Sequence, residues 1–233
     1  FKKLENISNL NKDEREYLYE AESKDVGQAL LAMLNRGYTV DVLWQISKEN
    51  KLFWPDQVWK LKRELPNNHI ILRILAEHEM LRCYVSDLKD VNKEVQKLSS
   101  GTSMTSEIRK IANLSGHLLS MEQHRQREDD LIFPELDHRG HDNLTLIVEK
   151  QHKEIKDSHY KLNQLIWNVD KMNFIEFQIV LDNLVKQLVP GMQKHVFVEN
   201  NIVLPLALEY IGEDNFWSKV KALSDEMGYC GYY

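Results

Sequence analysis

Apolar residues recur every three to four positions along most of the 233-residue chain, a period that predicts α-helices. In the first part of the chain the periodic runs are short: SKDVGQALLAMLNRG, VDVLWQISKEN and PDQVWKLKREL. Gly37 ends the first run, and Pro55 stands in the first turn of the third, where a helix tolerates proline. Residues 1–65 are therefore predicted to form a small helical N-terminal domain.

Four much longer periodic runs follow, at roughly 67–97, 104–138, 143–170 and 173–210. The polar stretches SSGTSMTS and DHRGHDN break the pattern after the first and the second run. A helix of about 28 residues is about 40 Å long. Four such helices with short connections predict an all-α fold, an up-down-up-down four-helix bundle over residues 66–212. The last run, DNFWSKVKALSDEMG, predicts a C-terminal helix and tail at 213–233.

The composition narrows the classes of function. Nine glycines and five prolines leave few turns, which fits long helices. The formal net charge of −6 argues against a nucleic-acid-binding protein, and no run of eighteen apolar residues is present that could span a membrane. No signal peptide is visible. We therefore expect a cytoplasmic protein in which Cys83 and Cys230 stay reduced and Cys83 packs in the interior.

One phrase occurs twice in the chain. Residues 124–134 read HRQREDDLIFP and residues 195–205 read HVFVENNIVLP. In each phrase a glutamate follows the histidine by four residues, so that both side chains lie on one face of a helix. The apolar residues that follow continue an inward-facing pattern, and two buried carboxylates require a compensating cation. The alternative is two ordinary histidine–glutamate pairs on the surface.

Four of the nine histidines fall one to each long helix. They are His78, His124, His152 and His195, at successive separations of 46, 28 and 43 residues. A long, a short and a long step are what alternating connections at the two ends of a bundle produce, so all four can lie at one level. A single histidine on an amphipathic helix is more often a hydrogen-bonded core residue, but that interpretation weakens when four share a level. His69 is the alternative to His78.

Two further histidines keep a fixed offset from these positions. His117 lies seven residues before His124, and His159 lies seven residues after His152. On antiparallel neighbours both offsets point toward the same end of the bundle, about 10 Å from the level of the four histidines. The pair is interpreted as boundary packing, with a proton or access path as the alternative.

The residue types indicate a metal centre. Imidazole together with carboxylate suits iron, and six protein ligands are too many for one tetrahedral zinc. They suit two metal ions bridged by both glutamates, with room for an oxide, a hydroxide or water. The candidate metal ligands are His78, His124, Glu128, His152, His195 and Glu199.

The stretches around these residues resemble the hemerythrin-like HHE cation-binding family. They are EHEML, MEQHRQREDDLIFPELDHRG, EKQHKEI and QKHVFVENNIVLPLAL, and the resemblance covers roughly residues 66–212. It implies a four-helix bundle with a non-haem di-iron centre, oxo- or hydroxo-bridged, held by the same six residues. Val148 stands where the oxygen carriers of the family have a further histidine. The set of four histidines and two carboxylates is similar to that of iron–sulfur cluster repair proteins, although residues 1–65 lack their cysteine pair.

The resemblance implies a function in binding or reacting with O2 or NO. It favours a role in oxidative or nitrosative stress or in the repair of iron centres, and it includes a nitric oxide reductase-like oxidoreductase. The alternatives are a di-iron sensor of redox state or oxygen and an iron-binding store without turnover. The chain is also similar to proteins in which a small helical domain of unknown function precedes a hemerythrin domain. A sensor would engage a protein partner through residues 1–65, and the oligomeric state stays open.

Overall fold

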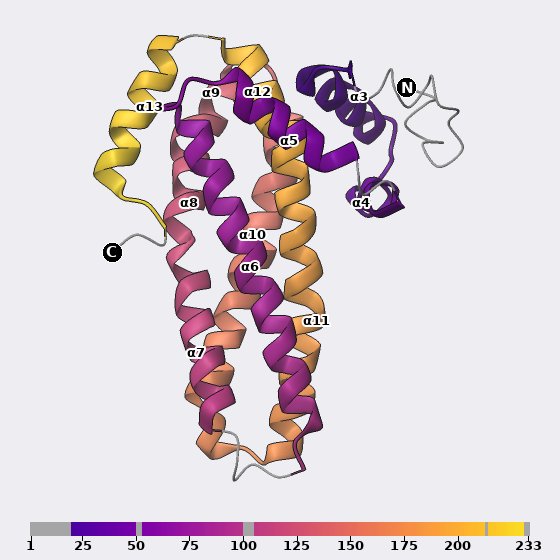
Figure 1. Ribbon diagram of the computed structural model, residues 1–233, viewed down its shortest axis with the longest axis vertical. Helices are drawn as coiled ribbons and strands as arrows, with labels where there is room; N and C mark the ends of the chain where they lie inside the picture. Colours follow the sequence, from indigo (N-terminus) through magenta and orange to yellow (C-terminus); the bar gives the residue numbers. More distant parts are fainter. Residues whose placement is uncertain (1–19, 50–52, 100–104, 213, 231–233) are drawn as a thin grey trace.

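The computed structural model describes residues 20–49, 53–99, 105–212 and 214–230, and every regular element in these ranges is helical (Figure 1). The short helices are α3 (Ser23–Asn35), α4 (Val40–Glu49), α5 (Phe53–Glu64) and α13 (Asp214–Met227). The long helices are α6 (Ile70–Lys97), α10 (Asp142–Trp167), followed by a 3-10 turn η4 (Val169–Lys171), and α11 (Phe174–Val198). The remaining elements are α7 (Thr105–Ser120), α8 (Glu122–Arg127), η3 (Glu128–Ile132), α9 (Phe133–His138), η5 (Glu199–Val203) and α12 (Leu204–Ile211).

Four long helical segments lie side by side (Figure 1). They are α6, the run α7–α9, α10, and the run α11–α12. Their contacts close a ring, because α6 packs against α7 and α11, while α10 packs against α7 and α11. The predicted all-helical fold is therefore confirmed for the described residues, and the four long segments match the four predicted runs to within a few residues.

The first long helix begins three residues later than the pattern predicts, and His69 explains why. The Nδ1 atom of His69 accepts a hydrogen bond from the main-chain N–H of Ile71 at 3.2 Å, so this histidine caps the helix N-terminus. Its ring also packs against the ring of Trp217 in α13, with centroids 5.2 Å apart. His69 therefore caps the N-terminus of α6 and packs against α13.

The core of the bundle consists of two apolar clusters. One gathers residues of α3 to α5 with the neighbouring ends of the long segments, for example Leu30, Leu75 and Phe133. The other fills the opposite part of the bundle, for example Leu81 and Leu118. Because α3 to α5 share the first cluster with the bundle, the division of the chain at residue 65 stays a prediction.

Helix α3 approaches the bundle through a glycine. A Cβ atom on Gly27 would lie 3.3 Å from the main-chain oxygen of Asn201 and 3.3 Å from Cγ of Leu206. Gly27 therefore lets the backbone of α3 rest directly on η5 and α12, which it contacts along much of its length.

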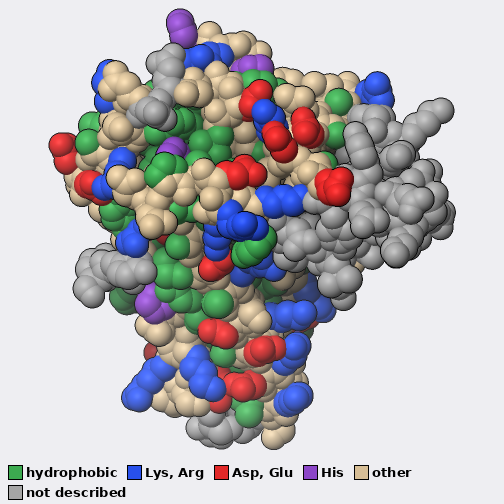
Figure 2. Space-filling view, turned by 45° about the horizontal axis from the view of Figure 1, so that its top comes forward, with side chains coloured by type: hydrophobic (Ala, Val, Ile, Leu, Met, Phe, Trp, Pro, Cys, Tyr) green, Lys and Arg blue, Asp and Glu red, His purple; other side chains and the backbone are tan. Residues whose placement is uncertain are grey.

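The surface carries both kinds of charge. On the face in Figure 2, Lys and Arg side chains are interspersed with Asp and Glu. Cys83 is exposed on α6, so the prediction that it packs in the interior is wrong, whereas Cys230 is buried. The apolar spacing around Cys83 misled the prediction, since the stripe of α6 that faces inward runs through Leu81 and Val85 on either side of it. None of the described helices combines the length and the apolar character that a membrane-spanning helix requires.

Replacing Gly27 with valine should weaken the packing of α3 against η5 and α12. Overpacking a close contact typically costs about 1–3 kcal/mol. The matched control is Gly116→Val in α7, because a Cβ there meets nothing within 4 Å. Chemical denaturation should show Gly27→Val to be less stable than Gly116→Val by about 1–3 kcal/mol, and equal stability of the two variants would contradict the close approach.

His159 should make stability depend on pH. It is 5% exposed and neither ring nitrogen has a hydrogen-bond partner. Burial and the positive charge of Arg125 lower its pKa to about 3, whereas an unfolded histidine titrates near 6.5. Titration of His159 therefore leaves the free energy of unfolding unchanged above pH 6.5 and lowers it as the pH falls from 6.5 toward 3.

In metal-free protein, His159→Leu should be more stable than wild type at pH 7 by about 1 kcal/mol, because no buried polar ring remains unpaired. The difference should grow by about 1.4 kcal/mol for each pH unit below 6.5. Urea denaturation of both proteins between pH 7 and pH 5 measures this difference in the free energy of unfolding. A difference independent of pH would refute the lowered pKa of His159.

Candidate metal centre

The structure brings the six candidate residues together in the interior of the bundle. His78, His124, Glu128 and Glu199 each offer a nitrogen or oxygen atom within 4.8 Å of the others, and Glu128, His152, His195 and Glu199 do the same. All six residues are at most 4% exposed. The two groups share both glutamates, and each takes two histidines from different helical segments. His69 belongs to neither group.

The repeated phrase forms the same backbone feature twice. Glu128 and Glu199 each begin a π-helical segment, η3 and η5, in which the main-chain N–H of residue 133 or 204 donates to the carbonyl of the glutamate five residues earlier. Pro134 and Pro205 follow at once. Proline has no N–H to donate and its ring crowds the carbonyl four residues back, so an ordinary helical turn is unfavourable there. The wider turn relieves that conflict, and π turns of this kind often occur at functional sites.

The residue after each glutamate orients a histidine on another segment. The Nδ1–H of His152 donates to Oδ1 of Asp129 at 2.8 Å, and the Nδ1–H of His78 donates to Oδ1 of Asn200 at 2.6 Å. A partner at Nδ1 fixes the tautomer and turns Nε2 toward the centre, as occurs with histidine ligands of metals. The π turns therefore carry a glutamate and a histidine-orienting side chain in adjacent positions.

His124 is oriented by Glu77, a fully buried residue of α6. The Nδ1–H of His124 donates to Oε2 of Glu77 at 2.8 Å, and Arg127 forms an ion pair with the same oxygen. Burial alone would raise the pKa of Glu77, but His124, Arg127 and the main-chain N–H of Cys230 lower it to about 2. Glu77 is therefore a carboxylate at neutral pH. By contrast, Nδ1 of His195 has no hydrogen-bond partner.

The sequence analysis missed these orienting residues. Glu77 directly precedes one candidate ligand, and Asp129 and Asn200 directly follow the two glutamates, so all three stand within the stretches quoted above. A polar residue after the glutamate in both copies of the phrase was the available signal. Its partner lies on another helix, however, and the contact was not visible before the helices were placed.

The geometry between His78 and His124 indicates a cation. Their Nε2 atoms lie 3.1 Å apart, and each ring donates its Nδ1–H elsewhere. Two Nε2 lone pairs facing each other at this distance repel unless a proton or a metal ion lies between them. Oε2 of Glu199 also lies close to this pair, 2.8 Å from Nε2 of His78.

The second group shows the same convergence. Nε2 of His152 lies 3.5 Å from Oε2 of Glu128 and 3.4 Å from Oε1 of Glu199, and Nε2 of His195 lies 3.2 Å from the latter oxygen. Both oxygens of both glutamates are buried and make no hydrogen bond. Burial and the negative charge of Glu199 raise the pKa of Glu128, and burial lowers the pKa of His195 to about 3. Buried, unsatisfied donor atoms of these types fit metal cations.

The two remaining predicted histidines lie in different surroundings. His117 stacks on Tyr84 with ring centroids 4.8 Å apart and planes inclined by 5°. His159 is buried in the second apolar cluster's half of the bundle, near Arg125. No hydrogen bond or ring contact recorded for the described residues joins the two, which agrees with separate packing roles.

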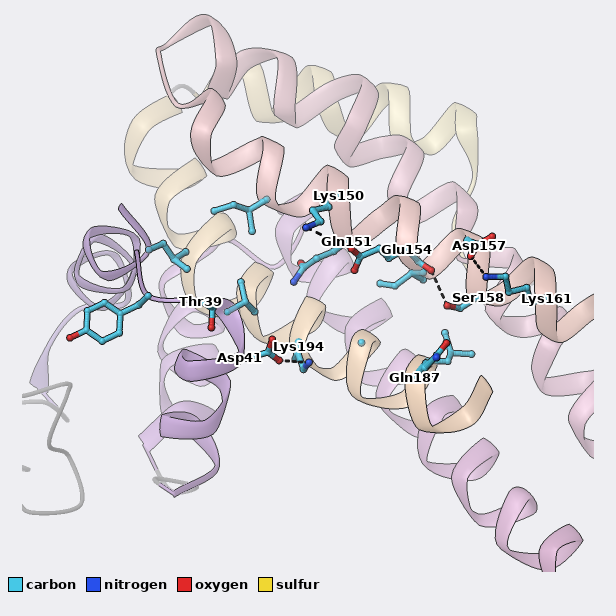
Figure 3. A pocket seen from close by; sticks show the side chains of 17 residues that line it. Thr39, Asp41, Lys150, Gln151, Glu154, Asp157, Ser158, Lys161, Gln187 and Lys194 are labelled. Atoms are coloured by element: carbon cyan, nitrogen blue, oxygen red, sulfur yellow. Dashed lines mark hydrogen bonds and ion pairs between the residues drawn. The ribbon is translucent and has the colours of Figure 1, made fainter. Parts of the chain in front are cut away.

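A pocket of about 760 Å³ is lined by residues that are neighbours in sequence of the second group, although none of the six candidate residues lines it (Figure 3). Residues of α4, α10 and α11 line it, among them Gln151 and Lys194, which directly precede His152 and His195. Lys194 forms an ion pair with Asp41, and Lys161 pairs with Asp157 at 2.5 Å. Lys150 lies 4.0 Å from Glu154, so each lysine of the lining has an acidic neighbour and the lining is of mixed charge.

A comparison with protein families agrees with this geometry. The model of the hemerythrin HHE cation binding domain matches residues 69–207, more than half of the chain, and the match includes all six candidate residues. A search of curated proteins found no significant match. Domains of this family bind metal cations, typically iron, and the two buried histidine–glutamate groups fit such a site. The chain belongs to the hemerythrin family of HHE cation-binding domains.

Proposed function

We propose that the chain is a non-haem di-iron protein that binds a small diatomic ligand, O2 or NO. His78 and His124 would hold one iron, His152 and His195 the other, and Glu128 and Glu199 would bridge them. The observation that carries the proposal is the overlap of the two groups, which share both glutamates. A single ion would leave half of these buried donor atoms without a partner.

The proposal includes an up-down-up-down course of the four long segments. Sequential neighbours α6 and α7, α7 and α10, and α10 and α11 are in contact, and α11 closes the ring onto α6. An antiparallel course of this kind supports the proposal because it allows the long and short separations between the four histidines to bring them to one level.

An iron pair of this type, when bound, supplies electrons and open positions to a diatomic ligand. The side chains of this chain supply the surroundings. Glu128 and Glu199 provide negative charge in the interior, and Phe133 lies over the ring of His152, with centroids 5.9 Å apart and planes inclined by 18°. Buried Met121 and Val198 lie three residues from His124 and His195 and help to keep water out. Such an apolar shell tunes a metal site.

The number of donors favours reactivity over oxygen storage. Val148 is fully buried and apolar, and it offers no donor atom to the centre. Six protein ligands leave more coordination positions open than the larger ligand set of the oxygen carriers. We therefore place the protein in oxidative or nitrosative stress or in the repair of iron centres, in the cytoplasm.

A second candidate function, a sensor without turnover, is favoured by the close packing of α3 against η5. Gly27 rests on the main-chain oxygen of Asn201, two residues after Glu199. A change at Glu199 would therefore reach the N-terminal helices through direct contact. Anaerobic exposure of the reduced protein to NO separates the two functions, because formation of nitrous oxide supports an enzyme, whereas tight binding without product supports the sensor.

Metal analysis tests the proposed function. Wild-type protein should contain about two irons per chain. Glu128→Ala and His195→Ala should each lose most of the iron, because each removes a donor, while circular dichroism should show the helices retained. The control Glu154→Ala changes an exposed glutamate of α10 and should keep both irons. One zinc per chain in the wild type, or unchanged iron in both site variants, would refute the proposal.

A further inference from the structure

The two halves of the centre differ in how their histidines are supported. In the first half, His78 is held by buried Asn200 and His124 by fully buried Glu77. In the second half, His152 is held by Asp129, whose side chain is 41% exposed, and Nδ1 of His195 has no partner. Partners at Nδ1 strengthen histidine as a ligand, and water weakens such a partner.

The difference between the two halves is also present in the sequence, at Gln151. Gln151 directly precedes His152, as Glu77 directly precedes His78. Where the first half has a carboxylate that reaches the histidine of the neighbouring segment, the second half has a neutral amide. Oε1 of Gln151 is buried without a hydrogen-bond partner, as is Nδ1 of His195.

The last described residues of the chain fix Glu77 in place. The main-chain N–H of Cys230 donates to Oε1 of Glu77 at 3.0 Å. Arg127, which pairs with the other oxygen, donates through Nη1 to the main-chain carbonyl of Gly228 at 2.6 Å. The ring of Tyr229 lies over the Arg127 guanidinium, 5.0 Å from its carbon. We call residues 228–230 the C-terminal strap.

The strap stabilises the buried ion pair between Glu77 and Arg127. Glu77 is 0% and Arg127 1% exposed, and a buried ion pair is favourable only when further hydrogen bonds satisfy its remaining atoms. Cys230 and Gly228 each supply one such bond from the main chain, so removing either would admit water or let the carboxylate turn away from His124. Both hydrogen bonds from the strap to the pair come from backbone atoms, so every residue at position 230 except proline would keep the bond to Glu77.

We propose that Glu77, held by Arg127 and the C-terminal strap, is a positioning residue that makes the metal ion at His78 and His124 the more tightly retained of the two. The proposal rests on the proposed di-iron function. It makes the ion at His152 and His195 the exchangeable one. Gln151 and Lys194, which directly precede these two histidines, line the pocket of Figure 3. The end of the described chain thereby controls metal retention at a site formed by the long helices.

Release of iron to a chelator tests the proposal. Wild-type protein should release its two irons in two phases, and its iron Mössbauer spectrum should show two different sites. Glu77→Gln should speed the slow phase by about 10–100-fold, the usual effect of losing a partner behind a metal ligand. Asp129→Asn should speed only the fast phase.

A matched pair of variants isolates the strap. Cys230→Pro removes the N–H that donates to Glu77, while Cys230→Ala keeps it and removes only the thiol. Cys230→Pro should speed the slow phase and shift one Mössbauer site, and Cys230→Ala should behave like wild type. A purely structural role would instead lower the melting temperature of both variants and leave the surviving spectrum unchanged.

The outcomes separate this proposal from the proposed function. Wild-type protein without iron would overturn both. Two irons that leave in a single phase would overturn the role of Glu77 and leave the di-iron function standing, and this measurement needs no variant. Equal release rates for Cys230→Pro and Cys230→Ala, or an effect of Asp129→Asn on the slow phase, would also overturn it.

Discussion

The structure depends on a layer of polar side chains buried across the middle of an apolar core. On every long segment the candidate ligand stands between residues of the two apolar clusters, as His78 stands between Leu75 and Leu81, and His152 between Val148 and Ile155. Burying imidazoles and carboxylates together costs free energy unless each polar atom is paired or a cation is present. The hydrogen bonds from Asn200, Asp129 and Glu77 meet part of that requirement, and the glutamate oxygens that remain unpaired define where positive charge is needed.

This requirement explains why supporting residues are so close in sequence to the ligands. An i, i+4 pair places His124 and Glu128 on one face, and the π turn that begins at Glu128 places Asp129 toward a neighbouring helix. The second copy of the phrase repeats the arrangement with Asn200. At the position after the glutamate, the first copy has the exposed acid Asp129 and the second has the buried amide Asn200. The residue before His78 is the carboxylate Glu77, whereas the residue before His152 is the amide Gln151. A nearly symmetrical backbone thus carries an electrostatically unequal site.

Periodicity and histidine spacing were sufficient to predict the helical bundle and to select six residues that the structure brings together. Both signals are local or depend only on segment lengths. His69 could not be separated from His78 by sequence, because the choice depends on where the helix begins. Cys83 was wrongly predicted to be buried because it lies between Leu81 and Val85, and the apolar spacing alone did not show that only those two face inward. Glu77, Arg127 and Cys230 lie far apart in the chain, and their mutual contacts became visible only once α13 was placed against α6 and α8.

The two prolines that end the π segments have a consequence for how the centre forms. Pro134 and Pro205 cannot donate a main-chain hydrogen bond whether or not an ion is present, so an ordinary helical turn is unfavourable at both positions in either case. We therefore expect the wider turns to form whether or not an ion is bound. Preorganisation of this kind reduces the conformational entropy that is lost when a cation binds between the helices.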